Sequence, residues 1–107
     1  MNKLQKKVKK FTEKHNIETK IEFRVLDLIS EAGELSKEFL LATEYGKAEF
    51  VPTKDWESEL GDVLFCVLFL ANSSEINLND IFSKTLEKYK DRIEKSGQPG
   101  SGKKFTE

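Results

Sequence analysis

The sequence predicts an all-α protein, a small helical bundle of about four helices that is completed by association of identical chains. Apolar residues recur three and four positions apart over most of the chain, which is the spacing of one helix face. We find no internal repeat and no run of alternating apolar and polar residues typical of a strand. The 107 residues suffice for one domain but bury only a modest fraction of their surface, so a second copy would help to stabilise it.

The first helix is expected near the N-terminus, where Leu4, Val8 and Phe11 recur at i, i+4 and i+7. Six lysines occupy its other faces. They would form either a nucleic-acid-binding patch or a solvated face. We favour the solvated face, because the net charge of −1 gives the chain no bias toward a nucleic-acid polymer.

A second helix is expected from about Lys20 to Thr43, because this segment has no proline and its apolar residues have helical spacing. A third helix begins after Thr53, a suitable N-cap, and runs to about Asn72. From Leu60 onward the third helix is apolar almost all round, which is typical of a helix buried on most sides. Another subunit is the obvious cover in a chain this short.

The fourth helix is capped by either Asn77 or Asn79 and is ended by Gly97. Residues 1–96 therefore form a single helical domain. Residues 97–107 are expected to form a flexible tail rich in Gly and Lys.

The composition also indicates a cellular setting. Cys66 is the one cysteine, so no internal disulfide is possible, and its apolar neighbours predict a buried core thiol. The N-terminus is rich in Lys and lacks the apolar stretch of a secretory signal. The longest apolar run, residues 63–71, is about half of the ~20 residues that a membrane span needs. We therefore expect a cytoplasmic protein without a membrane span.

Two pairs of acidic residues, Glu31 with Glu34 and Glu59 with Asp62, carry the chemistry that the sequence predicts. Each pair is spaced i, i+3, so its two carboxylates share a helix face. A short loop joins the two helices, which makes them antiparallel neighbours and lets the pairs face one another. Facing carboxylates are costly unless a cation neutralises them. Oxygen ligands without Cys or His favour Mg²⁺, with Mn²⁺ as an alternative.

Two other interpretations of these pairs stay open. Taken alone, Glu31 and Glu34 would be ordinary surface charges, but Glu59 and Asp62 interrupt an apolar helix. Alternatively, the acidic faces dock a basic protein partner in a non-enzymatic helical interaction module. In that case the two pairs need not converge, and metal would not stabilise the fold.

The sequences EAGEL at residues 31–35 and ELGDVL at residues 59–64 resemble the paired motifs of the MazG-like nucleotide pyrophosphohydrolases. The similarity extends over roughly residues 20–95. This family stands with the dimeric dUTPases and the phosphoribosyl-ATP pyrophosphohydrolases among the all-α NTP pyrophosphatases. The resemblance implies a helical bundle whose protomers pair as a homodimer or homotetramer. It also implies Mg²⁺ held by the four carboxylates, and cleavage of a nucleoside triphosphate to a monophosphate and pyrophosphate.

Lys84, Lys88 and Arg92 lie at i, i+4 and i+8 of the last helix, a spacing that is also common on solvent-exposed faces. MazG-like proteins often carry Lys, Lys and Arg there and use such residues on phosphates. The resemblance thus implies that all three bind substrate, with Lys88 or Arg92 neutralising the leaving pyrophosphate. Many relatives carry Asn at the position of Leu86, so nucleotide recognition is expected to differ in detail.

Two further side chains are candidates for the site. Glu38 lies one turn beyond Glu34, where it would orient the attacking water, bind a further ion or face solvent. Trp56 lies one turn before Glu59, where it would stack on the nucleotide base or plug the start of its helix. We favour the hydrophobic plug.

Together with the resemblance to MazG-like proteins, these observations predict a Mg²⁺-dependent hydrolase that cleaves nucleoside triphosphates, with dNTPs or modified NTPs as substrates, at the α-phosphorus. An enzyme cleaving at the γ-phosphorus would be expected to carry a glycine-rich phosphate loop between a strand and a helix. The segment GQPGSGK at residues 97–103 has such glycines, but a helix precedes it and no Ser or Thr follows its Lys. We therefore exclude a P-loop.

Overall fold

The computed structural model describes residues 2–98, and these residues contain no strand. They form four α-helices, which are α1 (Lys3–Lys14), α2 (Ile21–Ala42), α3 (Lys54–Ser73) and α4 (Leu78–Ser96). The predicted all-α class and the four predicted helices are confirmed. Most of the predicted tail, from residue 99 on, lies outside the described residues. Among the described helices, none combines the length and the apolar character that crossing a membrane requires.

Side chains at the helix ends explain where the helices begin and end. The Thr53 hydroxyl accepts a hydrogen bond of 3.0 Å from the Trp56 backbone N–H, as an N-cap does. Asn77, rather than Asn79, caps α4, and its side chain accepts a bond of 3.0 Å from the Asn79 N–H. Gly97 ends α4 with φ of 76°, a left-handed conformation that glycine adopts without strain.

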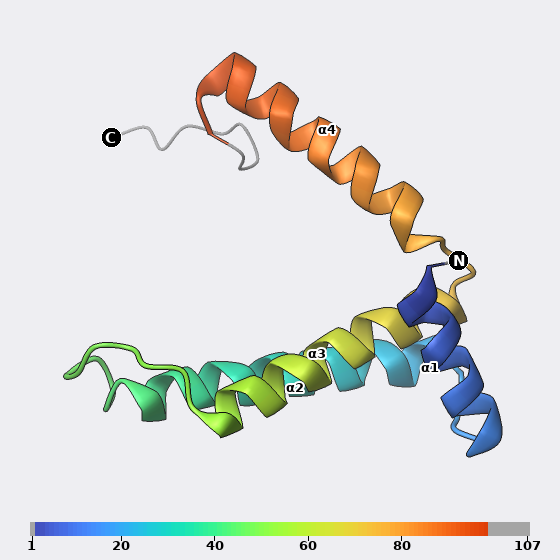
Figure 1. The fold of residues 1–107 in the computed structure, drawn as a ribbon, viewed down its shortest axis with the longest axis horizontal. Coiled ribbons are helices and arrows are strands. Elements are labelled where there is room, and N and C mark those ends of the chain that lie inside the picture. The colour runs from blue at the N-terminus through green and yellow to red at the C-terminus, as the bar shows by residue number, and fades with distance from the viewer. Residues whose placement is uncertain (1, 99–107) are drawn as a thin grey trace.

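Helices α2 and α3 lie side by side and antiparallel, joined by the loop of residues 43–53 (Figure 1). Helix α1 packs on α3 across the end of this hairpin at which α3 finishes. Helix α4 starts from the same end and extends away from the hairpin (Figure 1). The described residues therefore form the predicted helices, and among them α4 does not pack along the hairpin.

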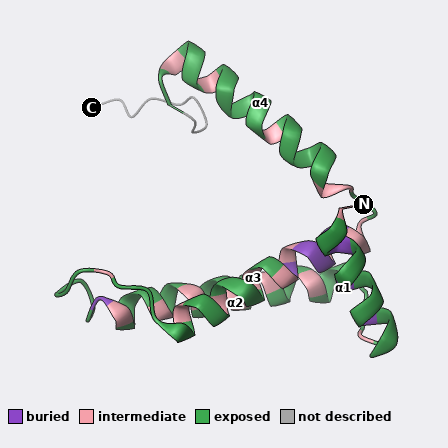
Figure 2. Cartoon of the chain, viewed as in Figure 1, coloured by how far each residue is buried: buried purple, intermediate pink, exposed green. Residues whose placement is uncertain are grey.

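The buried core lies where α1 meets α3. Val8 of α1 packs with Leu68 and Phe69 of α3, and Phe69 is only 2% exposed. Cys66 is also buried, as predicted. The remaining length of the hairpin and most of α4 have few buried side chains (Figure 2).

Gln5 of α1 is fully buried and ties three segments together. Its amide group donates hydrogen bonds to Asn72 Oδ1 (3.1 Å) and to the Ile76 carbonyl (2.7 Å). Its Oε1 accepts from the Leu78 backbone N–H (2.9 Å). The Asn72 side chain in turn donates to the Gln5 carbonyl (2.9 Å). This network fixes the end of α3 and the start of α4.

Much apolar surface is left uncovered within one chain. Large exposed apolar side chains on α2, α3 and α4 include Leu26, Ile29, Leu60, Leu64, Phe82 and Leu86. The radius of gyration is 17.1 Å, whereas a compact domain of this length has about 13 Å. The apolar faces predicted from the sequence are present, and the described residues of one chain do not cover them.

Candidate metal centre

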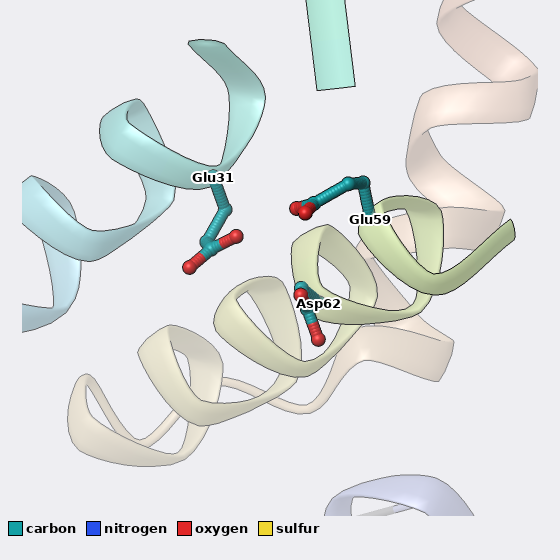
Figure 3. A group of neighbouring side chains, drawn as sticks. All are labelled: Glu31, Glu59 and Asp62. Carbon is teal, nitrogen blue, oxygen red and sulfur yellow. The ribbon is translucent and has the colours of Figure 1, made fainter. Parts of the chain in front are cut away.

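Three of the four predicted metal-binding carboxylates meet across the hairpin. Glu31 projects from α2, and Glu59 and Asp62 project from α3, one turn apart (Figure 3). One carboxylate oxygen from each residue lies within 4.8 Å of the other two. The register of the antiparallel hairpin brings them together, because both acidic pairs lie a few turns from the connecting loop.

Glu59 is the member of this group with an enclosed carboxylate oxygen. Its Oε2 is enclosed and has no hydrogen-bond partner within the described chain. Burial, then a side-chain hydrogen bond with Glu31, then the charges of Asp62, Glu31 and Glu34 raise the pKa of Glu59 above its ordinary value of 4.5. Enclosing an anion among like charges is unfavourable unless a cation compensates it.

In the part of the chain that the structure describes, no ion pair gives these carboxylates a basic partner. Within residues 2–98, the ion pairs are Arg24–Asp27 and Lys95–Asp91, and neither involves the three carboxylates. The donor set contains only hard oxygens, which suit Mg²⁺ or Mn²⁺ better than Zn²⁺. The enclosed, unpartnered oxygen of Glu59 and this donor set both fit a divalent cation.

Glu34 and Glu38 lie on the same helix as Glu31 but outside the group of three. Glu34 is exposed, yet it is near enough for its charge to contribute to the raised pKa of Glu59. Glu38 is half-buried and lies two turns beyond Glu31. The predicted metal role of Glu34 and water-orienting role of Glu38 stay predictions.

Lys84, Lys88 and Arg92 line one surface of α4. The Lys88 Nζ lies 5.2 Å, and the Arg92 Cζ 5.8 Å, from the centre of the Tyr89 ring. Because α4 extends away from the hairpin (Figure 1), a single chain does not bring these basic groups to the carboxylates. Their predicted role in binding phosphates stays a prediction.

Trp56 belongs to an aromatic cluster near the loop end of the hairpin. Its ring centre lies 5.0 Å from that of Phe50 and 6.3 Å from that of Phe39, and the two Phe rings are 5.0 Å apart. These contacts bury apolar surface where α3 begins. They favour the hydrophobic plug over the stacking of a base on Trp56.

A charged pair that the sequence did not single out borders the carboxylates. Arg24 Nη2 lies 3.2 Å from Asp27 Oδ2, and the Arg24 Cζ lies 4.4 Å from the centre of the Phe69 ring. In the sequence, the i, i+3 spacing of Arg24 and Asp27 was the only indication of an ion pair on this helix. Such pairs are common on exposed helices, and only the packing of α2 on α3 distinguishes this one.

The fold and this centre define an all-α protein with a candidate metal site made only of carboxylates. Residues 20–96 match the MazG nucleotide pyrophosphohydrolase domain, and the chain belongs to that family. It is also similar to YpjD, an uncharacterized protein of Bacillus subtilis (strain 168), with 37% identity over 68 residues. The match covers 61% of this chain and 60% of YpjD, so the chain spans less than two thirds of that relative. No solved structure matches the chain.

Proposed function

We propose that this protein hydrolyses nucleoside triphosphates, with dNTPs or modified NTPs as substrates, at the α-phosphorus to a monophosphate and pyrophosphate. The observation that carries the proposal is the convergence of Glu31, Glu59 and Asp62 in a chain of the MazG family. The alternative, a non-enzymatic acidic module that docks a basic partner, does not require these residues to meet.

In this proposal, Glu31, Glu34, Glu59 and Asp62 hold Mg²⁺, for which Mn²⁺ can substitute. Bound Mg²⁺ would neutralise triphosphate charge and activate water for in-line attack. The chain's own part is to hold carboxylates from two rigid helices at one place, so that little reorganisation accompanies the reaction. The enclosed oxygen of Glu59 supports the assignment, because it lacks a partner within the described chain.

We assign the orientation of the attacking water to Glu38. Neutralisation of the departing pyrophosphate is assigned to Lys88, with Lys84 and Arg92 binding the distal phosphates. Two turns of α4 between Lys84 and Arg92 span about 12 Å, a reach that suits a chain of phosphates.

The proposal includes a homodimer or homotetramer in which α4 of one copy approaches the hairpin of another. The motivation is that α4 extends away from its own hairpin (Figure 1). Association would also cover Leu64 and Phe82, which are 49% and 63% exposed in the single chain.

Product analysis in ¹⁸O-labelled water tests the proposed reaction. A panel of dNTPs and NTPs is incubated with the protein and Mg²⁺, and the products of any cleaved substrate are identified. Label is expected in the nucleoside monophosphate, with unlabelled pyrophosphate. Orthophosphate and a diphosphate as first products would contradict the proposal. Label in the pyrophosphate would place the attack at the β-phosphorus instead.

A further inference from the structure

A hollow of about 280 Å³ adjoins the candidate metal centre. It shares Glu31 and Asp62 with that centre. Its other lining side chains are Arg24 and Asp27 of α2 and Phe65, Cys66 and Phe69 of α3. The hollow thus runs along both helices from the carboxylates toward the junction with α1. No step of the proposed hydrolysis uses Arg24 or Asp27.

Arg24 is held in a defined orientation within this hollow. Its side chain is only 11% exposed, its guanidinium lies over the Phe69 ring, and one of its nitrogens is paired with Asp27. Its Nε is enclosed without a hydrogen-bond partner in the described chain. The Asp27 side chain is 56% exposed, so its carboxylate keeps acceptor positions open. The pair therefore offers donors and acceptors side by side.

This combination does not suit a phosphate. A phosphate is an anion that mainly accepts hydrogen bonds at neutral pH, so beside Arg24 it would be repelled by the Asp27 carboxylate, which belongs to no proposed metal site. The edge of a nucleobase suits the Arg24–Asp27 pair better, because such an edge presents a hydrogen-bond donor next to an acceptor. Asp accepts from base amino groups, and Arg donates to ring nitrogens and carbonyl oxygens, in recognised base-edge pairings.

The position of the pair also suits a base. Arg24 precedes Glu31 by seven residues on α2, and Phe69 follows Asp62 by seven on α3, a distance of about 10 Å along each helix. A nucleotide whose phosphates lie at the carboxylates would extend its sugar and base over this stretch. Phe65, which is half-buried, supplies aromatic surface there. Burial raises the pKa of the Cys66 thiol, so this lining side chain adds no charge at neutral pH.

We propose that Arg24 and Asp27 read the base of the substrate and select nucleotides whose base carries an exocyclic amino group. Asp27 accepts a hydrogen bond from that amino group, and Arg24 donates to the neighbouring ring nitrogen or carbonyl oxygen. A base with a carbonyl in place of the amino group would direct an acceptor at the Asp27 carboxylate and be disfavoured. This inference rests on the proposed pyrophosphohydrolase function.

The test compares kcat/KM within two substrate pairs, dCTP with dUTP and dGTP with dITP. In dUTP a carbonyl replaces the amino group of dCTP and the adjacent ring nitrogen becomes a donor, whereas dITP simply lacks the amino group of dGTP. The wild type is expected to prefer the amino-bearing member by about tenfold or more, the discrimination that one good base-edge contact gives. Asp27→Asn should bring both ratios toward one, because an amide both donates and accepts. Arg24→Lys keeps the charge but loses the planar fork, and should also lower the ratios.

Glu22→Gln is the matched control. It removes one negative charge from an exposed position of α2 outside the hollow and should leave both ratios unchanged. If the wild type hydrolyses both members of each pair equally well, base reading by Arg24 and Asp27 is wrong. The same conclusion follows if both ratios stay unchanged in Asp27→Asn and in Arg24→Lys. In either case the proposed hydrolysis itself still stands. An equal rate change for both members of each pair in Asp27→Asn would overturn base reading too, since only the charge near the metal centre would then matter. Absence of any hydrolysis by the wild type would overturn the proposed function and this inference with it.

Discussion

The two ends of α3 differ in how far the chain satisfies its own side chains. Near the end of α3, Gln5 is fully buried with its amide hydrogen-bonded, and Phe69 is 2% exposed. Nearer the start of α3, an oxygen of Glu59 is enclosed without a partner, and Leu60 is half exposed. Near the end of α3, the chain itself supplies the hydrogen-bond partners and the apolar cover. We infer that the region near the start of α3 is completed by a cation and a second copy.

Removing Glu59 should have the largest effect on activity. Glu59→Ala is expected to lower kcat/KM for pyrophosphate release by more than about a hundredfold, because changing even the supporting groups of a metal site commonly costs 10–100-fold. The melting temperature without metal should not fall, since the variant loses an uncompensated charge. Glu57→Ala, at an exposed position of the same helix, is the control and should keep its activity. Substantial activity in Glu59→Ala would rule out the proposed centre.

Gln5→Ala tests the end of α3, where the buried polar groups are hydrogen-bonded within the chain. The variant leaves the Ile76 carbonyl and the Leu78 N–H without their partner, so unfolding in urea should show a loss of about 3 kcal/mol. Gln98→Ala, at an exposed position, should change the free energy of unfolding by less than about 0.5 kcal/mol. If both variants were equally stable, the Gln5 network would not determine the stability of the junction.

Leu64→Lys tests whether a second copy covers the open region. Leu64 is 49% exposed in one chain, and a lysine in an apolar interface would be a buried, unpaired charge. Light scattering should show the wild type as a dimer or tetramer and the variant shifted toward the 12.3 kDa of one chain. Glu57→Lys, a charge change at an exposed polar position of α3, should stay associated. A wild type that is monomeric at micromolar concentration would contradict the proposed association.

The pH dependence of stability without metal is the smallest expected effect. The pKa of Glu59 is raised in the folded protein, so between 4.5 and the raised value the folded state binds more protons than the unfolded state. Its contribution to stability is therefore present below pH 4.5 and is lost as the pH rises through that window. Glu59→Gln should lack this contribution, whereas Glu57→Gln should retain it. Identical pH profiles of the wild type and Glu59→Gln would show that Glu59 is not enclosed in solution.

Local signals in the sequence sufficed for the helices and for the meeting of three of the four predicted carboxylates. Thr53 and Gly97 mark helix ends through their own backbone and side-chain preferences, and the structure places them as predicted. Helical spacing and a short loop were also enough to predict that Glu31 would face Glu59 and Asp62, because a hairpin with a short connection is antiparallel.

Features that depend on contacts between distant segments were not predicted. The Gln5–Asn72 bonds join residues far apart in the sequence, although the capping box of Asn2 and Gln5 was a local signal for the start of α1. The start of α4 is likewise tied to α1 by the bond from the Leu78 N–H to Gln5 Oε1, which joins residues far apart in the sequence. Arg24 looked like any surface arginine, and its burial against Phe69 required α3 to be in place.

Thermal unfolding with and without Mg²⁺ tests most directly whether a cation completes the open region. The wild type should melt at a higher temperature with Mg²⁺, and binding to the folded state alone would add about 2.7 kcal/mol at a hundred times Kd. Asp62→Ala should lose most of this increase together with its activity. If Mg²⁺ does not stabilise the wild type, or stabilises Asp62→Ala equally, the assignment of the metal centre is wrong.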